Sequence, residues 1–202
     1  MAAETSNEHA ARVVRRRPSR KTASGTAKGG AATHANVTAR DGVLDVWAPG
    51  ASEATLRKAD FVAALSKATT MDLVEIERQG VPAQLFTFLA NRLNRPLSEV
   101  LRITGAPRST TLRKLSAGGR LDGTAGQAAL GVTRLLAKAR EMAAQSTHPD
   151  AADFDAARWL GAWISKPQPA LGGRRPEELL DTPTGLDAVM RVLGAIQSGV
   201  SV

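Results

Sequence analysis

Side chains that are able to perform catalysis are scarce in this sequence, and they do not gather into a predicted pocket. The three histidines are His9 and His34 near the N-terminus and His148 beside a proline. Each lies in a stretch without apolar periodicity, so none is expected in the enclosed site that general acid–base chemistry needs. Cysteine is absent, which excludes a disulfide and a cysteine-ligated metal. These observations predict no enzyme, no catalytic residue and no metal.

The acidic pairs and the glycine-rich segment have simpler explanations than a catalytic or nucleotide site. Asp153/Asp155 and Glu177/Glu178 fall near predicted helix N-termini, where the helix dipole favours carboxylates. The sequence has no GxxxxGK[ST] loop and no GxGxxG after a strand, and Leu171-Gly172-Gly173 is typical of a turn. We therefore expect no cofactor, and a small enzyme acting on nucleotides is the last of three hypotheses for this chain.

The distribution of charge points to a polyanionic partner. The 202 residues carry a net charge of +8. Residues 1–42 hold eight Lys/Arg against three Asp/Glu, residues 94–120 hold six against one, and residues 150–202 hold five against seven. Two basic blocks therefore precede an acidic module, and nucleic acid is the partner class that such basic blocks favour.

Composition indicates an all-α protein that begins with a disordered basic tail. Hydrophobic residues make up 43% of the chain and aromatic ones only 3%, which favours packed helices over aromatic-rich strands. Residues 1–42 lack apolar periodicity, so we predict disorder there, with Arg15–Lys21 either touching phosphates or merely solvated. No apolar run approaches the roughly 20 residues that span a bilayer. We therefore expect a cytoplasmic protein that does not enter a membrane.

Residues 43–80 are poorly defined by their pattern. A proline and a glycine interrupt the segment before a single indicated short helix, which carries Leu56, Phe61 and Leu65. Met71 follows, and translation from Met71 would still supply every motif described below. A misassigned start codon is therefore an open alternative for the preceding residues.

Residues 81–145 form the first predicted domain, a helical bundle around a helix-turn-helix. A short helix covers 97–103, and Gly105 supplies the positive φ that a sharp interhelical turn needs. A third helix over 108–117 places Leu112 and Leu115 inward and its basic and hydroxyl residues outward, as in a recognition helix. A long helix over 125–144 covers this unit with an apolar stripe. The alternative is an ordinary helical hairpin with a basic, solvated face.

Residues 150–202 form the second predicted domain, which a polar hinge at 146–150 joins to the first. Its first helix, over 153–165, has an apolar face that includes Phe154. A loop rich in Pro and Gly follows, and a last helix begins with Thr182 as its cap and Pro183 at its first position. The loop is either a shaped, rigid surface or merely a tight connection.

The C-terminal run follows a known pattern. Trp163 and Ile164 precede KPQPALGGRRPEELLDTPTGLDAVMRVLGAIQSGV, in which Ala-Leu-Gly-Gly, Pro, Leu-Leu, Thr and a final Ile-x-x-Gly occur in order. This run resembles the toxin-binding domain of Xre/MbcA/ParS antitoxins. At the positions of Ile164 and Gln168, that family more commonly has Leu and Asn.

The predicted helix-turn-helix is similar to that of the same family. The segment GAPRSTTLRKLSAGGRLD shares a Thr-Leu pair, a basic residue and Gly-x-Leu, at Thr111, Leu112, Lys114, Gly119 and Leu121. Two neighbouring positions differ, with Pro and Leu where the family often has Ser and Arg. Together the two resemblances cover residues 81–202.

The resemblance implies the antitoxin of a type II toxin-antitoxin system. In such a pair the C-terminal domain docks on a RES-domain toxin, which consumes NAD or transfers groups from it, and blocks the entrance to the toxin's active site. The family also implies a homodimer that represses its own operon, so the expected partners are the toxin and operator DNA. The alternative is a stand-alone helix-turn-helix transcription regulator whose C-terminal module binds another protein or dimerises.

These implications define two sets of candidate residues. The DNA-contact candidates lie on and just after the third helix of the first domain, and they are Arg108, Ser109, Thr110, Thr111, Arg113, Lys114 and Arg120. The toxin-contact candidates lie in the Pro/Gly-rich loop and the C-terminal tail, where apolar and Arg side chains are able to enter a cleft. They are Leu171, Gly172, Gly173, Arg174, Arg175, Pro176, Gly199, Val200, Ser201 and Val202.

Overall fold

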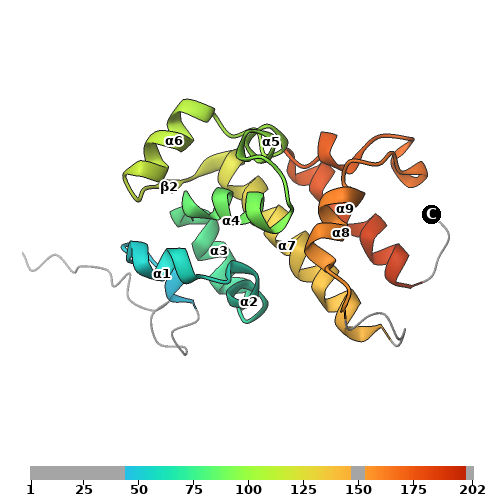
Figure 1. Cartoon of the computed structure of the whole chain (residues 1–202), viewed down its shortest axis with the longest axis horizontal. Helices are drawn as coiled ribbons and strands as arrows, with labels where there is room; N and C mark the ends of the chain where they lie inside the picture. Colours follow the sequence, from blue (N-terminus) through green and yellow to red (C-terminus); the bar gives the residue numbers. More distant parts are fainter. Residues whose placement is uncertain (1–43, 147–152, 199–202) are drawn as a thin grey trace, which may run out of the picture. The chain divides into compact units, whose positions relative to one another are not determined.

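Helices account for most of the chain in its computed structural model, which describes residues 44–146 and 153–198 (Figure 1). The predicted all-α fold is thereby confirmed. The expected disordered tail over 1–42, most of the expected hinge and the tail Gly199–Val202 lie outside the described residues.

Nine α-helices, three 3-10 helices and two very short strands occur in the described part of the chain. The strands, which the sequence did not indicate, are antiparallel, with Val81 opposite Leu121. The elements are η1 (Asp45–Trp47), α1 (Glu53–Lys58), α2 (Phe61–Ser66), α3 (Thr70–Gln79), β1 (Val81–Pro82), α4 (Gln84–Arg92), α5 (Leu97–Ile103), α6 (Arg108–Ser116), β2 (Arg120–Leu121), α7 (Gly123–Gln145), α8 (Ala156–Trp163), η3 (Pro169–Leu171), η4 (Pro176–Glu178) and α9 (Pro183–Gln197).

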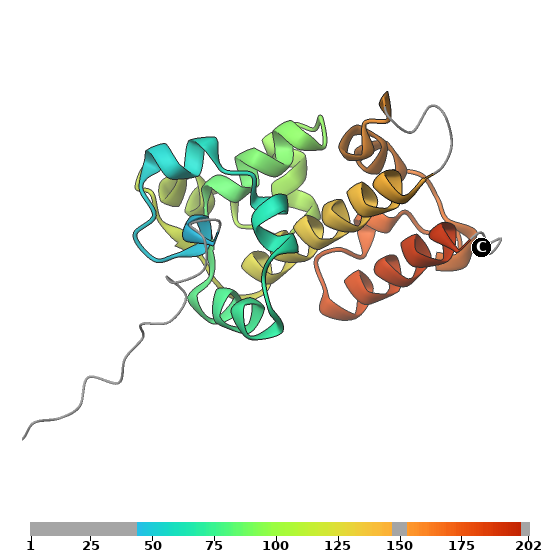
Figure 2. The same ribbon diagram turned by 90° about the horizontal axis from the view of Figure 1, so that it is seen from below.

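The long helix α7 supports most of the other helices. It contacts α2, α3, α4, α8 and α9, and Figure 2 shows α8 and α9 on opposite sides of its C-terminal half. The predicted apolar stripe is buried from Ala128 to Ala139, with Leu135 and Leu136 fully enclosed, whereas Met142 and Ala143 near its end are half-buried. The helix begins at Gly123 and ends at Gln145, within two residues of the predicted bounds.

Residues 44–80 form an ordered part of the core, whereas the sequence indicated only one short helix there. Trp47 and Phe61 are almost fully buried. The ring of Phe61 meets Trp47 edge to face at 5.0 Å and Phe88 of α4 at 5.2 Å. Because α1 and α2 have only six residues each, they are too short to show a helical period. A chain beginning at Met71 would lack the core residues Trp47 and Phe61 and, with them, the ring that contacts Phe88.

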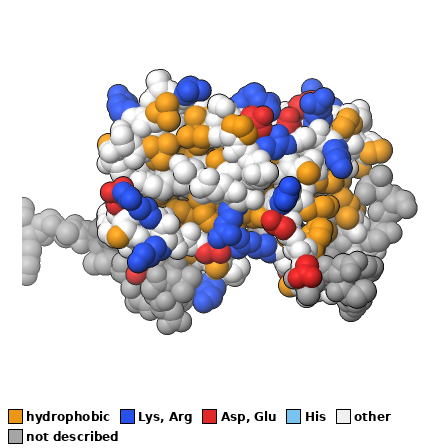
Figure 3. Space-filling view, in the orientation of Figure 1, with side chains coloured by type: hydrophobic (Ala, Val, Ile, Leu, Met, Phe, Trp, Pro, Cys, Tyr) orange, Lys and Arg blue, Asp and Glu red, His pale blue; other side chains and the backbone are white. Residues whose placement is uncertain are grey.

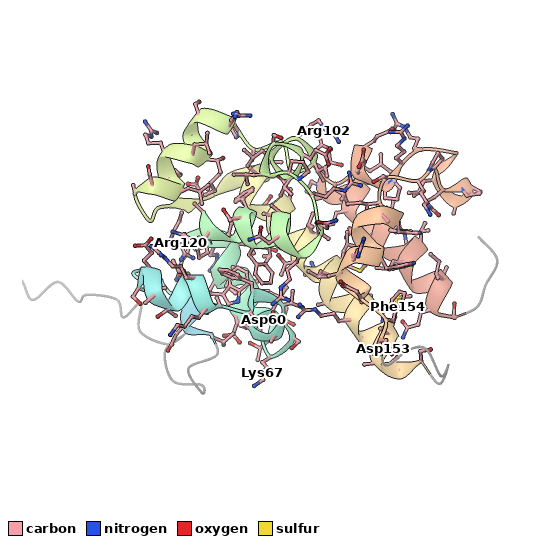
Figure 4. The ribbon with its side chains drawn as sticks, in the orientation of Figure 1. Asp60, Lys67, Arg102, Arg120, Asp153 and Phe154 are labelled. Atoms are coloured by element: carbon pink, nitrogen blue, oxygen red, sulfur yellow. The ribbon has the colours of Figure 1, made fainter. Side chains whose placement is uncertain are left out.

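Arg120 ties this N-terminal segment to the two strands (Figure 4). Its guanidinium donates hydrogen bonds to the carbonyl oxygens of Trp47, Ala48, Gln79 and Gly80. Burial lowers the pKa of Arg120, which measures the cost of removing the charge from water. The four carbonyl oxygens replace that water and hold the half-buried side chain in place.

Helices α5 and α6 form where the sequence predicts them. Gly105 lies in the turn between them with a φ of 62°, which a residue with a side chain rarely adopts. Thr104 is fully buried, and its hydroxyl donates a hydrogen bond to the carbonyl of Val100 at 2.8 Å. The turn is therefore fixed on both sides, and it sets the direction in which α6 leaves.

The C-terminal helices α8 and α9 pack against α7, and α8 also contacts the end of α4. The hydroxyl of Thr182 accepts a hydrogen bond from the backbone N–H of Gly185 at 3.1 Å, which confirms the predicted cap of α9. Gly161 of α8 lies so close to α4 that a Cβ on it would overlap the carbonyl oxygen of Leu93. The guanidinium of Arg95 donates to the carbonyl of Gly161 at 2.6 Å and strengthens this junction.

Asp60 joins the start of α2 to two other helices (Figure 4). Its carboxylate accepts hydrogen bonds from the backbone N–H groups of Val62 and Ala63, both at 3.1 Å. It also pairs with Arg140 of α7 at 3.1 Å and with Arg92 of α4 at 3.7 Å. Burial by itself would raise the pKa of Asp60, but the hydrogen bond from Ala63 and the charge of Arg140 outweigh it and lower the pKa.

Gly161→Ala tests the contact between α8 and α4. The added Cβ would overlap backbone, so we expect the free energy of unfolding to fall by about 1–3 kcal/mol. Gly194→Ala in α9 is the matched control, because its Cβ would meet nothing within 4 Å. That variant should be unchanged or more stable by up to about 1 kcal/mol. Urea denaturation measures both values, and equal stabilities would contradict the described packing.

Asp60 should make stability depend on pH in a defined direction. Because its pKa is lower in the folded chain, its stabilisation is complete above the unfolded value of about 3.9 and is lost as pH falls through the folded pKa. Asp60→Asn keeps a cap acceptor but has no charge to lose. Between about pH 5 and pH 2 we expect wild type to lose more thermal stability than the variant. A parallel loss in both proteins would show that the ion pairs contribute nothing.

Candidate functional site

The outer face of α6 presents basic and hydroxyl side chains to solvent. Arg108, Ser109 and Arg113 are exposed, whereas Thr110 and Lys114 are half-buried. Lys114 lies 3.9 Å from the carboxylate of Asp122 on the far side of the following turn. Within the described residues, neither Arg108 nor Arg113 has an ion-pair partner. Figure 3 shows Lys and Arg side chains along the edge where α6 lies.

Two of the predicted DNA-contact residues point into the protein. Thr111 is fully buried, and its hydroxyl donates a hydrogen bond to the carbonyl of Pro107 at 2.9 Å. Arg120 is occupied by the backbone carbonyls that hold the N-terminal segment. The structure therefore removes Thr111 and Arg120 from the candidate contacts and leaves the other five residues on or beside the exposed face.

Leu112 also differs from the prediction, because it is more exposed than expected. It was expected to face inward with Leu115, but 41% of Leu112 is exposed and only Leu115 packs against the core. Thr111 takes the inward place instead. An apolar side chain thus lies among the exposed cations of the outer face.

The Pro/Gly-rich loop after α8 has a closely defined backbone and exposed arginines. Gly172 and Gly173 have φ angles of 66° and 76°, which favour glycine. The N–H of Gln168 donates to the carbonyl of Arg174, and the carbonyl of Gln168 accepts from the N–H of Gly173, both at 3.0 Å. Arg174 and Arg175 are exposed. These bonds support the rigid-surface interpretation of the loop rather than a mere connection.

The residues at the two ends of the loop are less accessible than predicted. Pro176 is buried and begins η4, so it supports the loop and does not offer a contact. Leu171 is half-buried and packs against the core. The exposed part of this candidate surface is therefore 172–175. The other predicted contacts, Gly199–Val202, lie outside the described residues.

Glu177 anchors the end of the loop to α5 and to the turn before it. Its side chain is 7% exposed, yet its carboxylate lies 3.2 Å from the guanidinium of Arg102 in α5 and 3.8 Å from that of Arg95. A carboxylate so far removed from water needs such cationic partners, because an unpaired buried charge is strongly destabilising. The loop is therefore held against α5, the helix that leads into α6.

An aromatic stack on α8 was missed as a candidate surface. Phe154, expected to face the core, is 45% exposed. Its ring lies 5.9 Å from that of Trp159, which stacks on Trp163 at 5.9 Å with an interplanar angle of 17°. Phe154 is the exposed end of the stack, since Trp159 is half-buried and Trp163 is buried, and an exposed aromatic side chain is typical of protein–protein interfaces. The signal in the sequence was the presence of three of its few aromatic residues within one short segment.

The described part of the chain offers little support for a catalytic pocket, a metal site or a membrane span. A cavity of about 170 Å³ lies between α7 and α9, and its lining includes Glu77, Arg134 and Asp187 but no histidine. Across residues 44–146 and 153–198, no three metal-ligating side chains come together. The helices of these same ranges all fall short of the length and apolarity needed to cross a membrane.

Comparison with known proteins identifies the class of the second domain. Residues 152–199 match the antitoxin Xre/MbcA/ParS C-terminal toxin-binding domain. This range includes the aromatic stack, the Pro/Gly-rich loop and α9. The match indicates an antitoxin that has a toxin as its partner.

A full-length relative extends the similarity beyond this domain. The Prs ADP-ribosylating antitoxin of Sphingobium sp. (strain YBL2) is 31% identical over 136 residues, which is 67% of this chain and 84% of the relative. The chain belongs to the Xre/MbcA/ParS antitoxin family, as the C-terminal sequence pattern indicated.

Proposed function

We propose that this antitoxin neutralises a RES-type, NAD-consuming toxin by direct binding through its C-terminal domain, and that it represses its own operon by binding DNA. The observation that carries the proposal is the presence, on one chain, of a toxin-binding domain at 152–199 and an exposed cationic helix face on α6. In this proposal the antitoxin itself performs no chemistry and needs no cofactor.

In this proposal, helices α5 and α6 form the DNA-binding helix-turn-helix. The exposed residues Arg108, Ser109 and Arg113 lie at the start and middle of α6, the part of a recognition helix that reaches base edges. Arg side chains there are able to bind phosphates and guanine edges. A homodimer would place two α6 helices in half-sites about 34–36 Å apart, one helical turn of DNA.

The chemistry of the toxin is inferred from the relative. The name of that protein refers to ADP-ribosylation, a reaction in which ADP-ribose is transferred from NAD. A toxin that uses NAD is therefore supported for this chain also. We propose that residues 172–175, with Gly199–Val202, cover the entrance to the toxin's active site. A loop whose backbone is ordered before binding loses little conformational entropy when it docks.

Co-expression with the protein encoded beside this gene tests the whole proposal. We expect the neighbouring protein to stop growth alone, and growth to return when the full antitoxin is present. A variant without residues 150–202 should neither rescue growth nor co-purify with the toxin. Absence of toxicity and of any complex would leave the alternative, a stand-alone helix-turn-helix regulator.

Arg108→Ala combined with Arg113→Ala tests DNA binding by α6. We expect affinity for the operator to fall about tenfold or more, and the slope of log K against log salt to fall by about 0.9 for each phosphate that the variant no longer neutralises. Toxin neutralisation should be unchanged. Lys67→Ala is the control, because Lys67 is an exposed cation at the end of α2 (Figure 4). Fluorescence anisotropy over a salt series gives both quantities, and unchanged binding by the double variant would place the DNA elsewhere.

Arg174→Ala combined with Arg175→Ala tests docking of the loop on the toxin. Because arginines at the centre of interfaces often dominate binding, we expect affinity for the toxin to fall about thirtyfold and toxicity to return. Operator binding should persist. Arg191→Ala is the matched control, since Arg191 is exposed on α9 in the same domain. Growth assays and titration calorimetry measure the effect; full neutralisation by the double variant would exclude this loop as the contact.

A further inference from the structure

The outer face of α6 follows a regular helical stripe. Its exposed positions are the first, second, fifth, sixth and ninth residues of the helix, which are Arg108, Ser109, Leu112, Arg113 and Ser116. The fourth residue, Thr111, is buried and bonded to Pro107. Leu112 therefore lies in the middle of the exposed stripe, where it is the only large apolar side chain.

The neighbours of Leu112 limit what can cover it. Arg108 is one helical turn before it and Arg113 is adjacent, and both are exposed. A second copy of α6 would bring the same two cations against them, so like charges would repel. A polyanion is the partner that complements this surface. Double-stranded DNA presents one apolar group at the base edges of its major groove, the 5-methyl group of thymine.

We infer that Leu112 contacts the 5-methyl group of a thymine in each half-site of the operator. This inference rests on the proposed DNA binding by α6 and adds to it the identity of one recognised base. Arg108 and Arg113 bind phosphates or polar base edges on either side, while Leu112 buries the methyl group in the middle. Because neither group can form a hydrogen bond, the contact discriminates thymine from cytosine by apolar burial.

The experiment removes only the methyl group. The full chain selects its operator from a randomised duplex pool, and each thymine of the selected site is then replaced in turn by deoxyuridine. At one base pair of each half-site, we expect the affinity of wild type for the duplex to fall about fourfold, which corresponds to the free energy of burying one methyl group. Leu112→Ala should bind the thymine operator more weakly, and deoxyuridine at that base pair should cost it nothing further.

Controls separate the inference from the proposal on which it rests. Because 41% of Leu112 is already exposed, Leu112→Ala should keep the melting temperature of wild type. Deoxyuridine at the remaining thymines should have equal effects on both proteins. If wild type selects no duplex, the proposed DNA binding fails and the inference fails with it.

Two further results would overturn the inference while leaving DNA binding intact. The first is that no deoxyuridine substitution weakens DNA binding by wild type, or that any substitution that does so weakens DNA binding by Leu112→Ala equally. The second is a loss of dimer in Leu112→Ala with no dependence on the methyl group, which would place Leu112 in a contact between copies of the chain.

Discussion

Enclosure of α7 is the constraint on which the rest of the structure depends. Every position from Ala128 to Thr133 is buried, so more than one full turn of the helix is covered on all sides. Small side chains make such coverage feasible: a Cβ on Gly131 would overlap Leu186 of α9, and one on Gly126 would overlap the carbonyl oxygen of Leu121. The two candidate surfaces, α6 and the Pro/Gly-rich loop, therefore rest on elements fixed by the same helix.

An ion-pair cluster around the buried carboxylate of Glu177 links these two surfaces more directly. Glu177 ends the loop, and its cationic partners Arg102 and Arg95 belong to α5 and to the turn before it. Arg95 also holds the carbonyl of Gly161 in α8. These contacts cross the junction between α8, the loop and α5, so they favour its closed arrangement. The C-terminal segment that matches the toxin-binding domain is thus joined to α5 and to the end of α4 by specific polar contacts.

Local sequence signals predicted the parts of the fold that depend on local physics. Gly105 in its turn, the Thr182 cap and the bounds of α5 and α6 follow from backbone freedom, capping and short-range periodicity. The N-terminal segment was missed because its short helices are stabilised by distant contacts, such as the rings of Trp47 and Phe88 on Phe61. The same limit applies to the candidate site, since burial of Thr111 depends on tertiary neighbours that no local pattern reveals.

The face of α6 and the C-terminal segment each carry exposed arginines and partly exposed apolar side chains, and this composition explains how each would achieve specificity. Charge on α6 or on the loop attracts many anionic surfaces and favours rapid encounter, but it distinguishes poorly among them. Apolar contacts depend on close shape complementarity and discriminate better. Leu112 supplies such a group on α6, and Phe154 with Trp159 supplies one at α8. Because Leu112 and Trp159 lie on helices and not on free loops, their positions are set before a partner arrives, which lowers the entropic cost of binding.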